Sequence, residues 1–209
     1  MSMVEIINQK ISNPLGILQL GSLIVIIICV LTIITFIFIN FVEGSKKHKA
    51  KHKKKSIVET GTMFLFFFLY YFLIKFNVGL IQINNINLRV LTIIMGLILI
   101  VIGTVVNVKG RLKLGKNWAN QIKIYEDHTL VTSGIYGFVR HPLYASLIWM
   151  FYGGSLVYLN WSAFLLTTLI FIPFMYYRAK QEEKLLSKQF EDYSKYKQKV
   201  GMFFPKIIR

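Results

Sequence analysis

The sequence predicts an all-α integral membrane protein with about five transmembrane helices and a polar site on one side of the membrane. The chain of 209 residues is 55% hydrophobic, and its mean hydropathy is +0.54. Its apolar residues fall into runs that are long enough to cross a bilayer. A soluble nucleic-acid-binding protein would share the formal net charge of +16 but not these runs, so no nucleic-acid partner is expected.

The membrane spans follow from the length of the apolar runs. A helix needs about 20 mostly apolar residues to cross a hydrocarbon core about 30 Å thick. Pro173 is expected to kink the last run. Asn160 leaves room for only a very short turn, which predicts that the last two spans form a tight antiparallel hairpin. The runs are 17–42, 60–81, 88–108, 143–159 and 161–179.

The basic residues predict the orientation. Seven lysines lie from Lys46 to Lys55, and further basic blocks follow the third and fifth spans, whereas the opposite side receives only Lys10, Lys75 and Arg89. Cytoplasmic loops of membrane proteins are enriched in lysine and arginine. The N-terminus is therefore expected outside, and the C-terminus and the polar site in the cytoplasm.

The lysine run and the single cysteine are expected to have no catalytic role. The run is interpreted as a solvated topological anchor, with binding of anionic lipid as an alternative. His48 and His52 have a spacing that suits metal ligands on a helix, but the lysines around them repel a cation, so no metal site is expected. Cys29 excludes an intramolecular disulfide and is interpreted as a small buried apolar side chain.

Two polar segments share the cytoplasmic side. Residues 109–142 are expected to form an irregular excursion with short extended pieces, and 178–209 to contain an amphipathic helix on the bilayer surface or on the protein body. Tyr193 and Tyr196 are interpreted as interface anchors. Pro142 suits the first turn of the following helix, where unpaired N–H groups favour an anionic ligand group.

Chemically active side chains stand at both ends of the predicted hairpin. Residues 140–142 read Arg-His-Pro at its beginning, and Arg178, Glu182 and Glu183 follow its end. Arg178 and Glu182 share one helix face because they are four residues apart. The hairpin is expected to bring both ends to the same membrane face, where ionisable groups tend to line a cavity.

An ordered set of motifs runs through the C-terminal half, about residues 110–205: "LGKNW", "EDHTLVTSGIYGFVRHPLY", a two-span hairpin, "RAKQEEKLL", "FEDYSKYKQKV" and "FFP". In order and spacing it resembles the isoprenylcysteine carboxyl methyltransferases and the related phospholipid methyltransferases. The chain departs from the family pattern at Ile135, where proline is frequent, and at Phe190-Glu191, where Phe-Gly is frequent.

The resemblance implies two regions. Residues 1–109 would be a three-span membrane region with a basic cytosolic loop at 43–59, and 110–209 a methyltransferase core. The core would contain the cofactor loop, the hairpin and the C-terminal amphipathic helix.

The resemblance also implies a cofactor, S-adenosylmethionine, in a cytosolic pocket formed by the loop before the last hairpin and the helix after it. A lipid substrate would enter from the bilayer. Arg178 would bind this substrate, and Arg178 and Glu182 would be the catalytic residues. Carried over by position, the cofactor contacts would be Gln121, His128, Thr129, Leu130, Val131, Tyr136, His141, Pro142, Leu143, Tyr144, Glu182 and Glu183.

The residue types suit this chemistry. Glu182 can pair with the ammonium of the cofactor, the rings of Tyr136 and Tyr144 can stack and favour a cation, and His141 can hold the carboxylate or the purine edge. A carboxylate acceptor is already anionic at neutral pH and needs no general base. An arginine suits such an acceptor, so carboxyl O-methylation of an isoprenylcysteine-like or other lipidic carboxylate is favoured.

Three alternatives stay open at this stage. One is N-methylation of an amine in a phospholipid headgroup, which would require a base. Another is a sterol-reductase-like oxidoreductase, which would need further cations for the phosphates of a nicotinamide cofactor, whereas this sequence offers paired carboxylates. The third is a non-catalytic membrane protein that binds anionic lipid through its lysine run.

Overall fold

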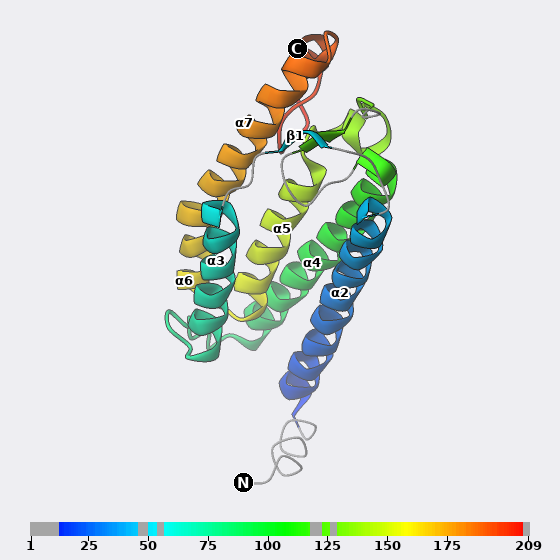
Figure 1. Cartoon of the computed structure of the whole chain (residues 1–209). Coiled ribbons are helices and arrows are strands. Elements are labelled where there is room, and N and C mark those ends of the chain that lie inside the picture. The colour runs from blue at the N-terminus through cyan, green and yellow to red at the C-terminus, as the bar shows by residue number, and fades with distance from the viewer. Residues whose placement is uncertain (1–12, 46–49, 54–56, 118–122, 126–128, 207–209) are drawn as a thin grey trace.

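The computed structural model describes residues 13–45, 50–53, 57–117, 123–125 and 129–206 as a bundle of long helices with a small β-ribbon at one end (Figure 1). The α-helices are α2 (Pro14–Ser45), α3 (Ile57–Lys75), α4 (Ile86–Leu114), α5 (Pro142–Val157), α6 (Trp161–Leu166), α7 (Ile172–Gln189) and α8 (Tyr193–Lys199). The other elements are the strands β1 (Ala50–Lys53) and β2 (Lys123–Tyr125), the 3₁₀ turns η1 (Gly115–Asn117) and η2 (Gly134–Gly137), and a π-helical turn, η3 (Thr167–Phe171).

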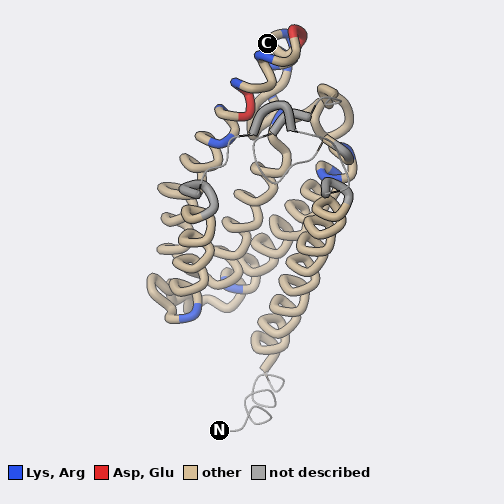
Figure 2. Tube along the Cα trace, viewed as in Figure 1, with Lys and Arg blue, Asp and Glu red and all other residues tan. Residues whose placement is uncertain are grey.

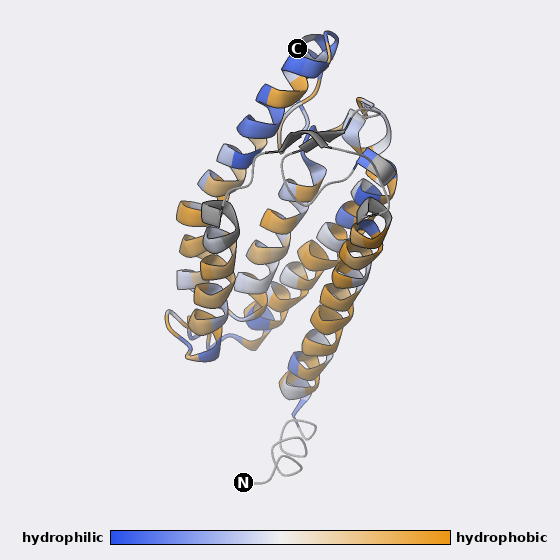
Figure 3. Ribbon diagram, viewed as in Figure 1, coloured by the Kyte–Doolittle hydropathy of each residue, from blue (hydrophilic) through white to orange (hydrophobic). Residues whose placement is uncertain are grey.

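The helices have the surface of a membrane protein. In the described part of the chain, three helical stretches are long and apolar enough to cross a bilayer, and a shorter apolar helix covers 61–75. Figure 3 shows apolar residues along the middle of the bundle, and Figure 2 shows charged residues gathered toward the end that carries the C-terminus. The predicted all-helical membrane architecture is thus present, while five crossings and their orientation stay a proposal. The three stretches are 14–42, 86–114 and 161–189.

The predicted hairpin is present and turns within three residues. Helix α5 ends at Val157 and α6 begins at Trp161. The side chain of Asn160 caps α6, because its Oδ1 accepts a hydrogen bond from the Ala163 N–H at 2.8 Å. Its Nδ2 donates to the Leu73 carbonyl at 3.2 Å, which ties the turn to the end of α3.

The returning arm of the hairpin contains a π-helical turn just before Pro173, where a kink was predicted. Residues 167–171 are π-helical, and α7 begins immediately before the proline. A π-turn widens the helix locally. The helix continues through Pro173 to Gln189.

Close packing between α4 and α5 depends on glycine. A Cβ atom on Gly153 would lie 2.5 Å from the Gly96 carbonyl oxygen, and one on Gly103 would lie 2.9 Å from the Ser146 carbonyl oxygen. Small residues let membrane helices approach until their backbones touch. These contacts hold α5, and with it the hairpin, on α4.

Aromatic rings attach α3 to the hairpin. The ring of Phe66 stacks on that of Phe171 with centroids 4.4 Å apart and meets that of Phe151 edge-on at 4.8 Å. Phe66 is buried among these residues. Helix α2 instead packs on α4, with buried Cys29 as expected.

Two features differ from the sequence-based picture. The lysine run is partly structured, because β1 pairs antiparallel with β2. The predicted amphipathic helix is interrupted, since α7 ends at Gln189 and α8 starts after extended Phe190. Helix α4 continues past residues 109 and 110, and the division of the chain into two regions at that point stays a prediction.

The C-terminal segment folds back on the start of the hairpin. Val139 forms a parallel bridge with Gly201. The Arg140 N–H donates to the Gly201 carbonyl at 2.8 Å, and the His141 N–H donates to the Met202 carbonyl at 3.0 Å. These bonds fix the backbone of the Arg-His-Pro segment.

Candidate functional site

A cavity of about 720 Å³ lies among α2, α3, α4, α5 and α7. This volume is typical of small-molecule sites. We call one part of it the polar end, lined by Arg111, Asn117, Thr129, Tyr136, His141, Tyr144, Arg178 and Glu182. We call the other part the apolar arm, lined by Ile26, Val30, Ile33, Ile34, Ile37, Met63, Phe67, Ile100, Leu147, Met150 and Phe151.

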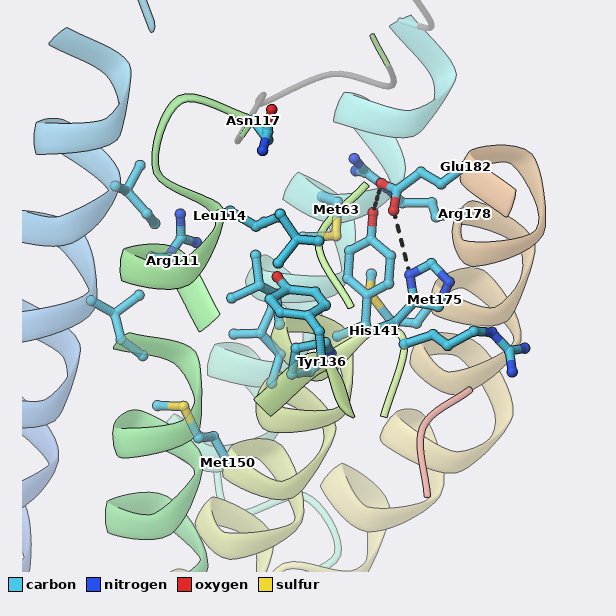
Figure 4. Close-up of a pocket in the computed structure, with 18 of the residues that line it drawn as sticks. Met63, Arg111, Leu114, Asn117, Tyr136, His141, Met150, Met175, Arg178 and Glu182 are labelled. Carbon is cyan, nitrogen blue, oxygen red and sulfur yellow. Dashed lines mark hydrogen bonds and ion pairs between the residues drawn. The ribbon is translucent and has the colours of Figure 1, made fainter. Parts of the chain in front are cut away.

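The two ends of the hairpin meet at the polar end, as the sequence predicted. The His141 Nδ1 lies 3.4 Å from Glu182 Oε2, and its Nε2 lies 3.3 Å from Glu183 Oε1. The hydroxyl of Tyr144 donates a hydrogen bond to Glu182. Figure 4 marks the contact between Glu182 and His141 with a dashed line.

The carboxylates determine the charge state of His141. Burial alone would lower the pKa of the imidazole, but hydrogen bonds and charges from Glu182 and Glu183 outweigh burial and raise the pKa above its ordinary value of 6.5. Both ring nitrogens of His141 therefore face acids of the protein itself. Its predicted contact with the carboxylate or the purine edge of a cofactor stays a prediction.

Arg178 lies beside Glu182 on the same face of α7. Its guanidinium carbon stands 5.8 Å from the centroid of the Tyr144 ring, within the range of a cation–π contact. Arg178 lines the cavity next to Glu182. The structure therefore places a cation and an anion side by side at the polar end.

Glu183 is placed differently from its neighbour. Its Oε1 accepts hydrogen bonds from Arg140 Nε at 2.9 Å and Nη2 at 2.7 Å, and its Oε2 lies 3.4 Å from Lys197 Nζ. The residues that line the cavity include Glu182 and not Glu183. Adjacent residues on a helix point in different directions, and the predicted contact of Glu183 with a cofactor stays a prediction.

The predicted cofactor loop lies partly in the described chain. Thr129, Leu130 and Val131 line the cavity. Asn117 holds this segment, because its Nδ2 donates to Thr129 Oγ1 at 3.0 Å and its Oδ1 accepts from the Thr129 N–H at 3.1 Å. Gln121 and His128 lie outside the described residues.

The beginning of the hairpin supplies the remaining predicted contacts. Tyr136, His141, Pro142, Leu143 and Tyr144 all line the cavity. Burial and then the charge of Glu182 raise the pKa of Tyr136 well above its ordinary value of 10. Tyr136 is therefore a neutral phenol at physiological pH.

The structure adds residues to the site that the sequence analysis did not assign to a cofactor or substrate. Arg111, Asn117, Arg140, Tyr193 and Tyr196 also line the cavity. The two tyrosines were interpreted as interface anchors, but Tyr193 is 1% exposed and the Tyr196 hydroxyl donates to the Tyr136 carbonyl at 2.6 Å. Burial, above all, raises the pKa of Tyr196 to about 12. The helical spacing of these tyrosines with Leu185 and Leu186 could have indicated that all four side chains point toward the cavity.

Residues 95–188 match the model of the Isoprenylcysteine carboxyl methyltransferase (ICMT) family. This segment contains most of α4, the segment before the hairpin and the whole hairpin, including the Arg-His-Pro and Glu-Glu sequences.

Two curated relatives match about half of this chain. The chain is 30% identical over 117 residues to the protein-S-isoprenylcysteine O-methyltransferase of Saccharomyces cerevisiae, covering 54% of this chain and 49% of the relative. It is 33% identical over 117 residues to the enzyme of that name from Xenopus laevis, covering 54% of this chain and 41% of the relative. The chain thus spans about half the length of the curated relatives that it matches.

A solved structure agrees with the fold. The chain is similar to the structure of the eukaryotic intramembrane Ras methyltransferase ICMT, with a TM-score of 0.54 and 25% sequence identity. The match covers 74% of this chain and 54% of the solved chain. The resemblance that the motifs predicted is confirmed, because a family model, curated relatives and a solved structure all match the isoprenylcysteine carboxyl methyltransferases, a family of methyltransferases.

Proposed function

We propose that the chain is a membrane-embedded, S-adenosylmethionine-dependent methyltransferase that forms the methyl ester of an isoprenylcysteine-like or other lipidic carboxylate. The observation that carries the proposal is a single cavity with a charged polar end and an apolar arm that follows α2. A soluble, zwitterionic cofactor and a lipid acceptor require these two environments side by side.

The residues at the polar end fit the cofactor. S-adenosylmethionine carries an ammonium, a carboxylate, a sulfonium and an adenine, and it supplies the methyl group when bound. Glu182 would pair with the ammonium. Tyr136 and Tyr144 would offer ring faces to the sulfonium and the adenine. Thr129–Val131 and the start of α5 would close the site.

The proposed reaction needs positioning more than acid–base chemistry. When bound, the cofactor would supply the methyl group and leave as a neutral thioether, so that an anionic acceptor would need no proton transfer from the protein. Arg178 would hold the acceptor carboxylate in line with the methyl group. Such alignment can lower a barrier by about 7–11 kcal/mol.

The apolar arm would hold the lipid part of the acceptor. It is lined by α2 and α3, which pack on different partners, α2 on α4 and α3 on α6. An acceptor would reach the arm from the bilayer between these helices. With the N-terminus outside, as the basic residues favour, the polar end would face the cytoplasm.

The test is methyl transfer by the protein in lipid nanodiscs. We expect tritium from methyl-labelled S-adenosylmethionine to appear as a base-labile ester on N-acetyl-S-farnesylcysteine. Label on phosphatidylethanolamine instead would support the amine alternative, and absence of cofactor binding by calorimetry would refute both. In the Arg178→Ala variant, we expect turnover to fall more than cofactor affinity does; unchanged turnover would remove its substrate role.

A further inference from the structure

The imidazole of His141 is not assigned to any ligand group in the function proposed above. Its side chain is only 6% exposed and stands at the N-cap of α5. Its Nδ1 lies 3.4 Å from Glu182 Oε2, and its Nε2 lies 3.3 Å from Glu183 Oε1 (Figure 4). Only the protonated ring can donate from both nitrogens at once. The geometry therefore suits an imidazolium placed between two carboxylates.

The groups around His141 favour this protonated ring. Burial lowers the pKa of the imidazole, but hydrogen bonds and charges from the two carboxylates outweigh burial and raise the pKa above 6.5. The neighbouring cations approach Glu183, with Arg140 Nη2 at 2.7 Å and Lys197 Nζ at 3.4 Å from its oxygens. The ring of Tyr144 stacks on the imidazole with centroids 5.6 Å apart.

Glu182 is the carboxylate that connects this ring to the cavity. Its side chain is 31% exposed, whereas that of Glu183 is 3% exposed, and Glu182 lines the cavity beside Arg178. A cation that enters the cavity at Glu182 meets a carboxylate that already has the imidazolium as a counter-ion. Because like charges disfavour each other's charged form, the incoming cation makes protonation of His141 less favourable.

We propose that the ammonium of S-adenosylmethionine replaces the charge of His141 at Glu182, and that the ring releases a proton when the cofactor binds. This inference rests on the proposed function. The N–H bond at Nδ1 breaks and its proton passes to the solvent, while the neutral ring keeps one N–H for Glu183. The imidazolium holds the carboxylate of Glu182 in place before the cofactor binds, so His141 is a positioning residue.

The experiment counts protons by calorimetry on the full chain in nanodiscs, in phosphate and in Tris at pH 7, because these buffers differ in their enthalpy of ionisation. We expect release of about 0.3 to 0.9 proton per cofactor bound, as for a pKa that falls by about one unit or more. The affinity should rise about two- to tenfold from pH 5.5 to pH 7. In this range the amine of the cofactor stays protonated, since α-amino groups titrate at about 7.7–8.0.

Two further ligands identify the group that causes the release. S-adenosylhomocysteine keeps the ammonium but lacks the sulfonium, and it should release as many protons as S-adenosylmethionine. Methylthioadenosine lacks the amino-acid part, and it should bind without releasing a proton.

The matched variants are His141→Gln and His52→Gln, a histidine of strand β1. His141→Gln should bind the cofactor without proton release and with an affinity that is constant from pH 5.5 to pH 7. His52→Gln should release as many protons as the wild type. A purely structural role of His141 would lower stability in His141→Gln without changing the proton count.

Three results would overturn the inference: no proton release by the wild type, undiminished release by His141→Gln, or release that requires the sulfonium or persists with methylthioadenosine. If His141→Gln does not fold, the two buffers and the ligand series on the wild type still decide. Absence of cofactor binding by the wild type would instead refute the proposed function.

Discussion

The two parts of the molecule that enclose the cavity are held together in different ways. The region from α4 to the C-terminus combines backbone contact between glycines with a dense polar network around Glu183 and His141. Helices α2 and α3 contribute mainly apolar side chains, and the buried positions of α2 form a narrow stripe of Gly16, Ser22, Cys29, Ile33 and Asn40.

The charged groups of the site thus belong to the region from α4 to the C-terminus, whereas α2 and α3 supply apolar surface. Groups that must be held in a fixed geometry lie where hydrogen bonds and close packing specify one arrangement. The lipid-like wall needs only apolar surface of suitable shape. Substitutions in the first region should therefore affect stability and cofactor binding, whereas those in α2 should affect the acceptor alone.

The largest effect is expected from Glu183→Gln. The Glu183 and Arg140 side chains are 3% and 7% exposed, and removing one charge leaves the other buried without its counter-ion. The free energy of unfolding should fall by about 3–5 kcal/mol, measured from thermal unfolding in nanodiscs. The exposed residue Glu191 provides the control, as Glu191→Gln. A stability equal to that of the wild type would refute the structural role of Glu183.

The second largest effect is expected at the adjacent carboxylate, Glu182. Glu182 lines the cavity, so Glu182→Ala should weaken S-adenosylmethionine about 10- to 100-fold through loss of a charged hydrogen bond. Calorimetry measures the affinity, with Glu191→Ala as the control. If folded Glu183→Gln lost as much cofactor affinity as Glu182→Ala, the assignment of different roles to the two acids would fail.

Packing between α4 and α5 can be tested at Gly153. A Cβ there would meet the Gly96 carbonyl oxygen at 2.5 Å, and backbone atoms cannot rotate away. Gly153→Ala should lower the free energy of unfolding by about 1–3 kcal/mol. Gly21→Ala in α2 is the matched control, since a Cβ there has no atom within 4 Å; equal effects of the two substitutions would contradict the comparison.

Stability should also depend on pH through His141. The pKa of His141 is raised in the folded protein above the ordinary value of 6.5. The contribution of the protonated ring to the free energy of unfolding is therefore complete below the ordinary pKa and is lost as the pH rises through the folded-state pKa. Thermal unfolding midpoints from pH 6 to 9 should therefore decline, and the decline should flatten in His141→Gln. If His141→Gln kept the wild-type slope, a group other than His141 would cause the pH dependence.

The smallest effect is expected in the apolar arm. Ile33 is buried in α2 and lines the cavity, so Ile33→Ala should raise the KM for a farnesylated acceptor about two- to fivefold by loss of dispersion contacts. The affinity for S-adenosylmethionine should stay the same. Phe38, which is 66% exposed, provides the control as Phe38→Ala. A weakened cofactor affinity in Ile33→Ala would mean that α2 also shapes the polar end.

Much of the site could be predicted because it depends on neighbouring parts of the chain. Because the turn at Asn160 between two apolar runs is very short, the second arm of the hairpin returns to the membrane face from which the first arm started. This return brings His141 and Glu182 together. The sequence could not distinguish Glu182 from Glu183, because only the docking of Arg140 against Glu183 shows which carboxylate is used within the protein.

The sequence by itself determined the apolar helices, the order of the motifs and the chemistry available at the ends of the hairpin, because hydrophobic length and residue type are local properties. Only the tertiary structure decided that β1 pairs with β2, that Tyr193 turns inward and that Arg111 lines the same cavity as Glu182. These contacts join segments far apart in the chain. They depend on how whole helices pack, which no local pattern specifies.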